Sequence, residues 1–68
     1  MTRLRINGAE ADVAAATIAD LLALRGVDAK ARFLAVAVNG AVVRRAEWPM
    51  RTLSPGDDVE IVRPLQGG

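Results

Sequence analysis

The Gly67-Gly68 pair at the end of the chain is the place where we expect covalent chemistry. Glycine lacks Cβ, so a Gly-Gly end can thread a narrow channel and adopt backbone conformations that are closed to other residues. Such an end offers an unhindered carboxylate to the active site of another protein. Chain ends are ordinarily frayed and without a role, so the interpretation depends on what the rest of the chain contains.

Other reactive groups are scarce. The chain has no cysteine and no histidine, which excludes disulfides, thiolate ligands, a cysteine nucleophile and the commonest general base. Ser54 therefore has no histidine partner and is interpreted as a turn residue. Asp57-Asp58 has no third ligand nearby in the sequence, so we expect turn formation and strand entry there. We predict no catalytic residue, no metal site and no turnover by the isolated chain.

Length and composition narrow the classes of protein further. The chain has 68 residues, of which 51% are hydrophobic and 25% charged, which indicates one small folded domain. Nine basic and eight acidic residues leave a net charge of +1, and only 3% are aromatic, which argues against a nucleic-acid partner. No signal peptide or membrane span is evident, so we expect no membrane association and a cytoplasmic location.

The last five residues are expected to form a tail. Pro64 should end the final strand because it cannot donate a ladder hydrogen bond, and Leu65 and Gln66 have no reason to be regular. We therefore predict a folded domain at 1–63 and a flexible Gly-Gly tail at 64–68. Fully extended, this tail reaches about 17 Å. Pro64 stiffens its root, and Leu65 could add an apolar anchor beside it.

The first half of the sequence predicts a hairpin followed by a helix. Leu4–Ile6 alternates as a half-buried strand, Asn7-Gly8 is typical of a type I′ turn, and Ala9–Val13 is the partner strand. Thr17 is a helix N-cap in a near capping box with Asp20. The helix should bury an apolar stripe and end at a left-handed glycine; these residues are Ile18, Leu21, Leu22 and Gly26.

The second half predicts three strands, at Leu34–Val38, Val42–Arg44 and Asp58–Arg63. Asn39-Gly40 is a second turn signal, and Ser54–Asp57 has the Pro and Gly positions of a type II turn. Trp48 should lie against the edge of the core. The Arg44-Arg45 pair is interpreted as solvated surface.

This order of elements predicts an α+β fold of the β-grasp, or ubiquitin-like, type: a mixed four- to five-stranded sheet with one main helix packed on one face. The opposite sheet face could dock a partner. If Leu4 and Ile61 and their apolar neighbours point inward, the residues that point to that face are Arg3, Arg5, Val62 and Arg63.

The sequence resembles the ThiS family, the sulfur carriers of thiamine biosynthesis, over almost its whole length. The residues that carry the resemblance are Asn39-Gly40, Val43, Arg44, Trp48, Gly56-Asp57, Val59-Glu60-Ile61 and Gly67-Gly68. The closest part is Val43 to Gly68. One departure is the Pro64-Leu65-Gln66 approach to the tail, which could alter the fit to a partner.

The resemblance implies a specific chemistry. A ThiF-like enzyme would use ATP to adenylate the Gly68 carboxylate, and a sulfurtransferase or cysteine desulfurase would supply the sulfur that makes it a thiocarboxylate. A ThiG-like thiazole synthase would then take the sulfur. The chain itself would bind no permanent cofactor, and Pro64, Leu65, Gln66 and Gly67 would present the tail.

Two other functions suit the same tail. A MoaD-like carrier for molybdopterin synthesis shares the fold, but is usually longer, and the Arg44…Trp48 pattern favours ThiS. A ubiquitin-like modifier would be conjugated to lysines of target proteins. A non-reactive β-grasp interaction domain that ends in glycine by accident is a third possibility.

Overall fold

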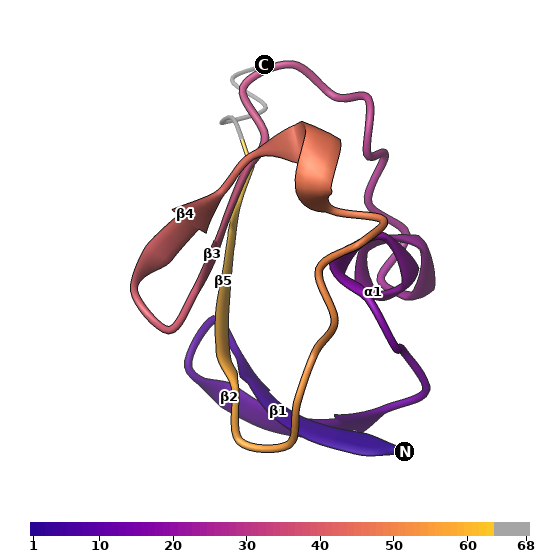
Figure 1. The fold of residues 1–68 in the computed structure, drawn as a ribbon, viewed down its shortest axis with the longest axis vertical. Coiled ribbons are helices and arrows are strands. Elements are labelled where there is room, and N and C mark those ends of the chain that lie inside the picture. The colour runs from indigo at the N-terminus through magenta and orange to yellow at the C-terminus, as the bar shows by residue number, and fades with distance from the viewer. Residues whose placement is uncertain (64–68) are drawn as a thin grey trace.

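The computed structural model describes residues 1–63, which form a five-stranded sheet covered by one α-helix (Figure 1). In chain order the elements are β1 (Thr2–Ile6), β2 (Ala9–Val13), α1 (Ile18–Leu24), β3 (Ala35–Val38), β4 (Ala41–Val43), the 3₁₀ helix η1 (Arg45–Glu47) and β5 (Asp58–Val62). The strands lie side by side in the order β2-β1-β5-β3-β4. The predicted tail at 64–68 lies outside the described residues, so the division at 63 stays a prediction.

The N-terminal hairpin forms as its sequence predicts. β1 and β2 pair antiparallel from Thr2 opposite Val13 to Ile6 opposite Ala9. Asn7 and Gly8 both have positive φ, at 49° and 85°, as the two central positions of a type I′ turn require. Alternation along β1 buries Leu4 and Ile6 and exposes Arg3 and Arg5.

The helix begins at the predicted cap. The Thr17 hydroxyl accepts from the backbone N–H of Asp20, while the Asp20 carboxylate accepts from the backbone N–H of Thr17, which makes a complete capping box. Ile18, Leu21 and Leu22 are buried. Gly26 has φ +72°, so the chain leaves the helix through the left-handed conformation expected of a glycine at this position.

The second half of the chain adds a hairpin and the central strand. β3 and β4 pair antiparallel around Asn39-Gly40, where φ is again positive at both positions. Ser54–Asp57 forms the expected turn, because Gly56 has φ +90° and the Asp57 N–H donates to the Ser54 carbonyl. β5 then runs parallel to β1 and antiparallel to β3.

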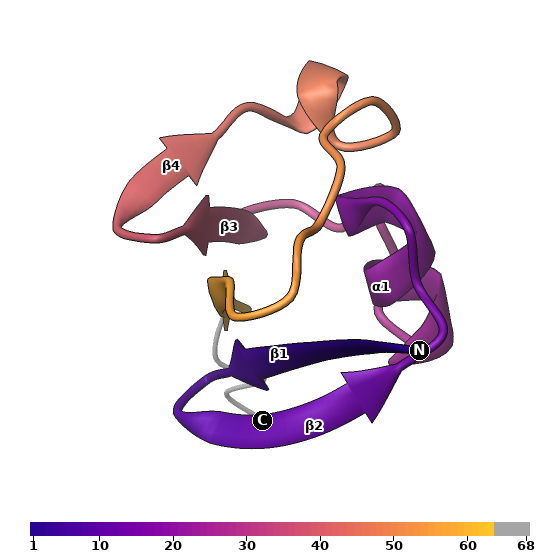
Figure 2. The same cartoon turned by 60° about the horizontal axis from the view of Figure 1, so that its bottom comes forward.

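The layers are a sheet and a helix with the core between them. Figure 2 shows α1 on one side of the sheet, with β4, β3, β1 and β2 spread across it. Mixed strand pairing and a single helix on one face make this the β-grasp arrangement, as predicted from the sequence. No helix within residues 1–63 has the length and apolar character that crossing a membrane requires.

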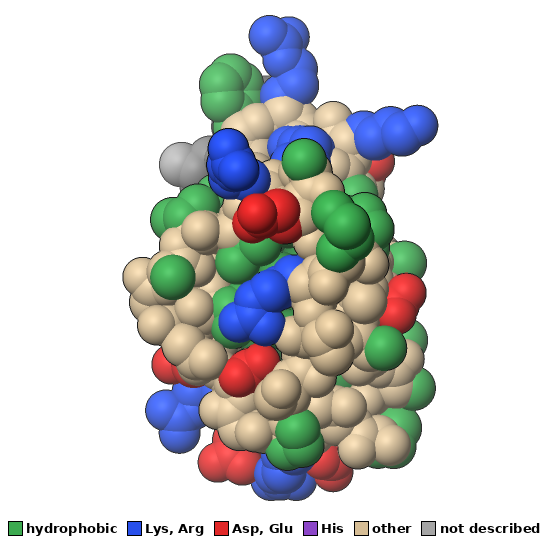
Figure 3. Space-filling model, viewed as in Figure 1, with side chains coloured by type: hydrophobic (Ala, Val, Ile, Leu, Met, Phe, Trp, Pro, Cys, Tyr) green, Lys and Arg blue, Asp and Glu red, His purple; other side chains and the backbone are tan. Residues whose placement is uncertain are grey.

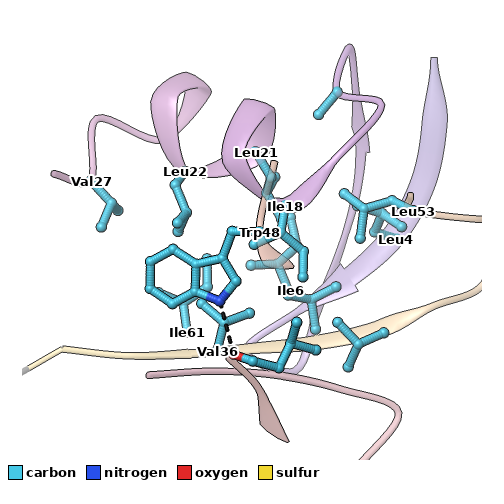
Figure 4. Close-up of a cluster of buried hydrophobic side chains, with 14 of the residues drawn as sticks. Leu4, Ile6, Ile18, Leu21, Leu22, Val27, Val36, Trp48, Leu53 and Ile61 are labelled. Carbon is cyan, nitrogen blue, oxygen red and sulfur yellow. Dashed lines mark hydrogen bonds between the residues drawn. The ribbon is translucent and has the colours of Figure 1, made fainter. Parts of the chain in front are cut away.

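Trp48 lies deeper than the edge position expected from the sequence. Its side chain is 2% exposed, and its indole Nε1–H donates to the Val43 carbonyl at 2.9 Å. Figure 4 shows the indole between α1 and the sheet, near Leu22 and Ile61. The hydrogen bond satisfies the one polar atom of the ring, which lets the whole side chain enter the core.

Candidate functional site

β5 is the strand that leads into the candidate reactive segment, and it occupies the centre of the sheet. It pairs with β1 through Arg5–Asp58 and Ile6–Val59, and with β3 over four residue pairs from Ala35–Val62 to Val38–Val59. Val59 and Ile61 are buried, whereas Val62 is 57% exposed. A central strand is paired on both sides, so the end of β5 is a fixed point from which the following residues start.

Asn7 extends the pairing of β5 beyond the end of β1. Its backbone N–H donates to the Val59 carbonyl at 2.9 Å. Its side-chain oxygen accepts from the Ile61 N–H at 2.8 Å, and its side-chain amide donates to the Ile61 carbonyl at 3.3 Å. β1 ends at Ile6 because the chain turns away from β5 at Asn7-Gly8. The Asn7 side chain therefore makes the hydrogen bonds to Ile61 that the backbone of a longer β1 would make.

A second asparagine holds the start of β5. The Asn39 side-chain oxygen accepts from the Asp58 N–H at 2.9 Å, and its amide donates to the Asp57 carboxylate at 3.0 Å. The other oxygen of that carboxylate accepts from the Ser54 N–H at 2.9 Å. Asp57 is thus used by the turn, in agreement with the turn role predicted for it.

The residues proposed for a docking face lie at two ends of β5. Arg3 and Arg5 are exposed on β1, and Arg5 is opposite Asp58 at the start of β5. Val62 and Arg63 are exposed at its end. Asp58 and Val62 are four steps of about 3.3 Å apart along β5, so Arg3 and Arg5 do not form one cluster with Val62 and Arg63. Their role in docking stays a prediction.

Arg3 is already engaged within the hairpin. Its guanidinium lies 3.0 Å from the Glu10 carboxylate and 3.2 Å from that of Asp12, and all three side chains are more than half exposed. The hydrogen bond to Glu10, with the negative charges of Asp12 and Glu10, raises the pKa of Arg3 above its ordinary value. Arg3 is therefore paired with two carboxylates of β2 in a cross-strand cluster.

The segments assigned to tail presentation and sulfur loading, Pro64, Leu65, Gln66, Gly67 and Gly68, lie outside the described residues. Within residues 1–63 no group of three or more aspartates and glutamates is placed to hold a metal ion. The pocket lined by Arg3, Arg5, Glu10 and Asp58 is an open depression of about 480 Å³ with mixed charge.

Sequence reasoning missed the role of Arg45, which it placed on solvated surface with Arg44. Both arginines are exposed, as predicted, but the Arg45 guanidinium also donates to the carbonyls of Ala29 and Ala31 and lies 4.9 Å from the centroid of the Trp48 ring. Arg45 therefore fastens the loop before β3 to η1 and Trp48. The spacing of an arginine three residues before a tryptophan was the available signal.

Comparisons with known proteins agree with this architecture. The family model described as "ThiS family" matches residues 4–68. A crystal structure of the thiamine biosynthesis protein ThiS from Geobacter metallireducens is 31% identical, with a TM-score of 0.78, and the match covers 98% of this chain and 100% of that one. An NMR structure of a thiamine biosynthesis protein from the same organism is 30% identical, with a TM-score of 0.79, and covers 98% and 88%. A comparison with curated proteins gave no match.

The fold defines a β-grasp protein, and the family match places it in a class of small sulfur carrier proteins that are generally non-catalytic. The chain belongs to the ThiS family.

Proposed function

We propose that this protein carries sulfur for thiazole formation in thiamine biosynthesis, as a thiocarboxylate on Gly68. The observation that carries the proposal is the family match, which extends through the Gly-Gly end of the sequence on a β-grasp core. The same match favours the thiamine pathway over a MoaD-like role in molybdopterin synthesis.

The first step would be activation of the Gly68 carboxylate. A carboxylate oxygen attacks the α-phosphorus of ATP, pyrophosphate leaves, and an acyl adenylate forms. This step is needed because a carboxylate has no good leaving group for sulfur to displace. In-line positioning of the carboxylate and ATP can supply roughly 7–11 kcal/mol of the barrier, and the activating enzyme provides that positioning.

The second step would exchange oxygen for sulfur. The terminal sulfur of a persulfide on a sulfurtransferase or cysteine desulfurase attacks the acyl carbon, and AMP leaves. A thiol then attacks the donor sulfur of the S–S bond carried over from the persulfide, which releases Gly68 as a thiocarboxylate and leaves the donor side as a disulfide. The net change on this chain is one oxygen replaced by one sulfur.

The partners that this scheme requires are a ThiF-like adenylating enzyme, which binds the ATP, and a ThiG-like thiazole synthase, which takes the sulfur. Two observations support a passive role for this chain. It has no cysteine or histidine, and the Asp57 carboxylate is occupied by hydrogen bonds of the turn. The chain contributes a stable globule and a fixed starting point for the reactive segment at the end of β5.

Mass spectrometry tests the proposal. The chain is incubated with a ThiF-like enzyme, ATP and a persulfide donor, and intact and fragment masses are recorded. We expect a mass increase equal to replacement of one oxygen by sulfur, located at Gly68 and dependent on ATP. Covalent adducts on lysines of other proteins would instead favour a ubiquitin-like modifier. An unchanged Gly68 with every ThiF-like enzyme tried would overturn the carrier function.

A further inference from the structure

Phe33 combines two properties that packing does not explain. Its side chain is 80% exposed, and its backbone has φ +64°, in the left-handed region. A bulky non-glycine residue incurs a conformational cost there. An exposed phenylalanine gains little from burial to offset this cost, so neighbouring contacts must hold the conformation.

The loop before β3 supplies those contacts. Arg45 donates to the carbonyls of Ala29 and Ala31 and stacks over Trp48 on its other side. Asp28 accepts from the Lys30 N–H through its side chain and from the Ala31 N–H through its carbonyl. These bonds fasten residues 28–31, and the Arg32 guanidinium lies 5.8 Å from the centroid of the Phe33 ring. The ring is therefore presented to solvent by a loop that is anchored just before it, which lowers the entropy lost when a partner covers it.

The sheet register places Phe33 at the end of β5. Ala35 is paired with Val62, and Phe33 precedes Ala35 by two residues. On the β4 side of β3, Val36 is paired with Val43. Arg44 follows Val43 and therefore comes next to Ala35 on the side away from β5. Ala35 and Val62 alternate with buried neighbours and face away from α1. We call the exposed set at this end the β5-end surface: Arg32, Phe33, Ala35, Arg44, Val62 and Arg63.

The charges of the chain are divided unevenly between its two ends. Residues 28–34, 44–48 and 63 hold five cations and two carboxylates, Asp28 and Glu47; the cations are Lys30, Arg32, Arg44, Arg45 and Arg63. The remaining described residues hold four cations and six carboxylates. Figure 3 shows blue side chains gathered at the end where β3 begins, at the top, and mixed signs at the opposite end.

We propose that the β5-end surface docks the enzyme that activates Gly68, and that this enzyme offers an apolar pocket for Phe33 bordered by carboxylates for Arg32, Arg44 and Arg63. The inference rests on the proposed function, because it takes Gly68 to be the group acted on. Gly68 is five residues beyond Arg63, so an enzyme that reaches it comes within about 17 Å of this surface.

The chemistry of activation favours the adenylating enzyme as the occupant. That enzyme holds the polyphosphate of ATP close to the carboxylate it attacks, and it must bring an anionic chain end toward an anionic nucleotide. The cations of the β5-end surface reduce this repulsion. They also speed association with an enzyme whose binding site is bordered by carboxylates. The exposed aromatic ring then supplies the apolar anchor of the interface.

Steady-state pyrophosphate release by a ThiF-like enzyme, with this chain as the varied substrate, tests the surface. Phe33→Gly retains a residue that accepts positive φ while removing the ring. We expect its KM to rise about tenfold or more, with kcat within about twofold, because the ring acts in docking and not in chemistry. For Arg32→Glu/Arg63→Glu we expect a similar rise in KM at low salt, which shrinks as salt is raised.

Met50→Ala and Arg25→Glu are the matched controls, since Met50 is 74% exposed and Arg25 ends the helix on the other face of the sheet. Both should retain the wild-type KM. Calorimetric binding of each variant to the enzyme without ATP separates the two proposals. If both β5-end variants bind more weakly but the wild type is not activated, the proposed sulfur-carrier function is refuted and the docking surface is supported. Normal activation with unchanged KM and affinity in these variants would overturn the surface alone.

Discussion

The side chain of Asn7 makes two hydrogen bonds to the backbone of Ile61, 54 positions further along the chain. These bonds continue the pairing of β5 past the last residue of β1. The same asparagine adopts the positive φ of the hairpin turn. One residue therefore both turns the first hairpin and holds the final strand close to the point where the reactive segment begins.

We predict that Asn7→Gly destabilises the fold while leaving the turn intact. Glycine accepts positive φ, so the loss is that of the two side-chain hydrogen bonds and of a partner for the Ile61 N–H. At about 0.5–1.5 kcal/mol per hydrogen bond, the free energy of unfolding should fall by about 1–3 kcal/mol. Chemical denaturation followed by Trp48 fluorescence measures this. Asn7→Asp, which tolerates positive φ and keeps an oxygen that can accept from the Ile61 N–H, is the comparison and should lose less. A loss equal to that of the glycine variant would refute the role of that hydrogen bond.

A second prediction concerns the helix cap. Thr17→Ala removes the hydroxyl that accepts from the Asp20 N–H and should lower the free energy of unfolding by about 1 kcal/mol. Thr17→Ser keeps the oxygen and should remain within about 0.5 kcal/mol of the wild type. Thermal unfolding by circular dichroism distinguishes the two. Identical midpoints for the alanine and serine variants would show that the capping box adds nothing to a helix of seven residues.

Arg45 should control the order of the loop before β3. Arg45→Met keeps the length and apolar stem of the side chain but loses the bonds to Ala29 and Ala31 and the cation over Trp48. We expect faster amide hydrogen exchange in residues 28–34 and little change in β1. Arg44→Met is the control, because Arg44 is 85% exposed and pairs weakly with Glu47 at 4.0 Å. Uniformly faster exchange across the sheet would mean that Arg45 supports the whole core instead.

Local signals predicted the elements of this fold because their causes lie within a few residues. Asn-Gly at two turns, Thr17 with Asp20, and Pro55-Gly56 each specify a backbone conformation that neighbouring residues cannot override cheaply. Strand alternation then predicted the buried residues of β1 and β5, which are Leu4, Ile6, Val59 and Ile61. The order of elements was enough to predict the β-grasp topology.

The side-chain contacts that shape the site could not be predicted in this way. The Asn7–Ile61 bonds join positions 54 apart, and they depend on how far β1 extends beside β5. Arg45 finds its carbonyl partners because η1 brings it against a loop 14 to 16 residues earlier. The docking residues were chosen by strand alternation alone, which gives the face but not the parallel offset that separates Arg3 from Val62.

Deletion of Gly68 should separate function from stability. The core of the described structure is built from residues between Leu4 and Ile61. Every buried side-chain nitrogen and oxygen among the described residues has a hydrogen-bond partner. We therefore expect the free energy of unfolding to change by less than about 0.5 kcal/mol, as for a substitution away from the core. Sulfur loading should be abolished, because the new terminal carboxylate on Gly67 would stop one residue, about 3.5 Å, short of ATP. Parallel denaturation curves and intact masses after incubation with a ThiF-like enzyme check both halves, and a Gly68→Ala variant reports whether the last position requires glycine. A large loss of stability on deletion would show that the end of the chain is part of the fold.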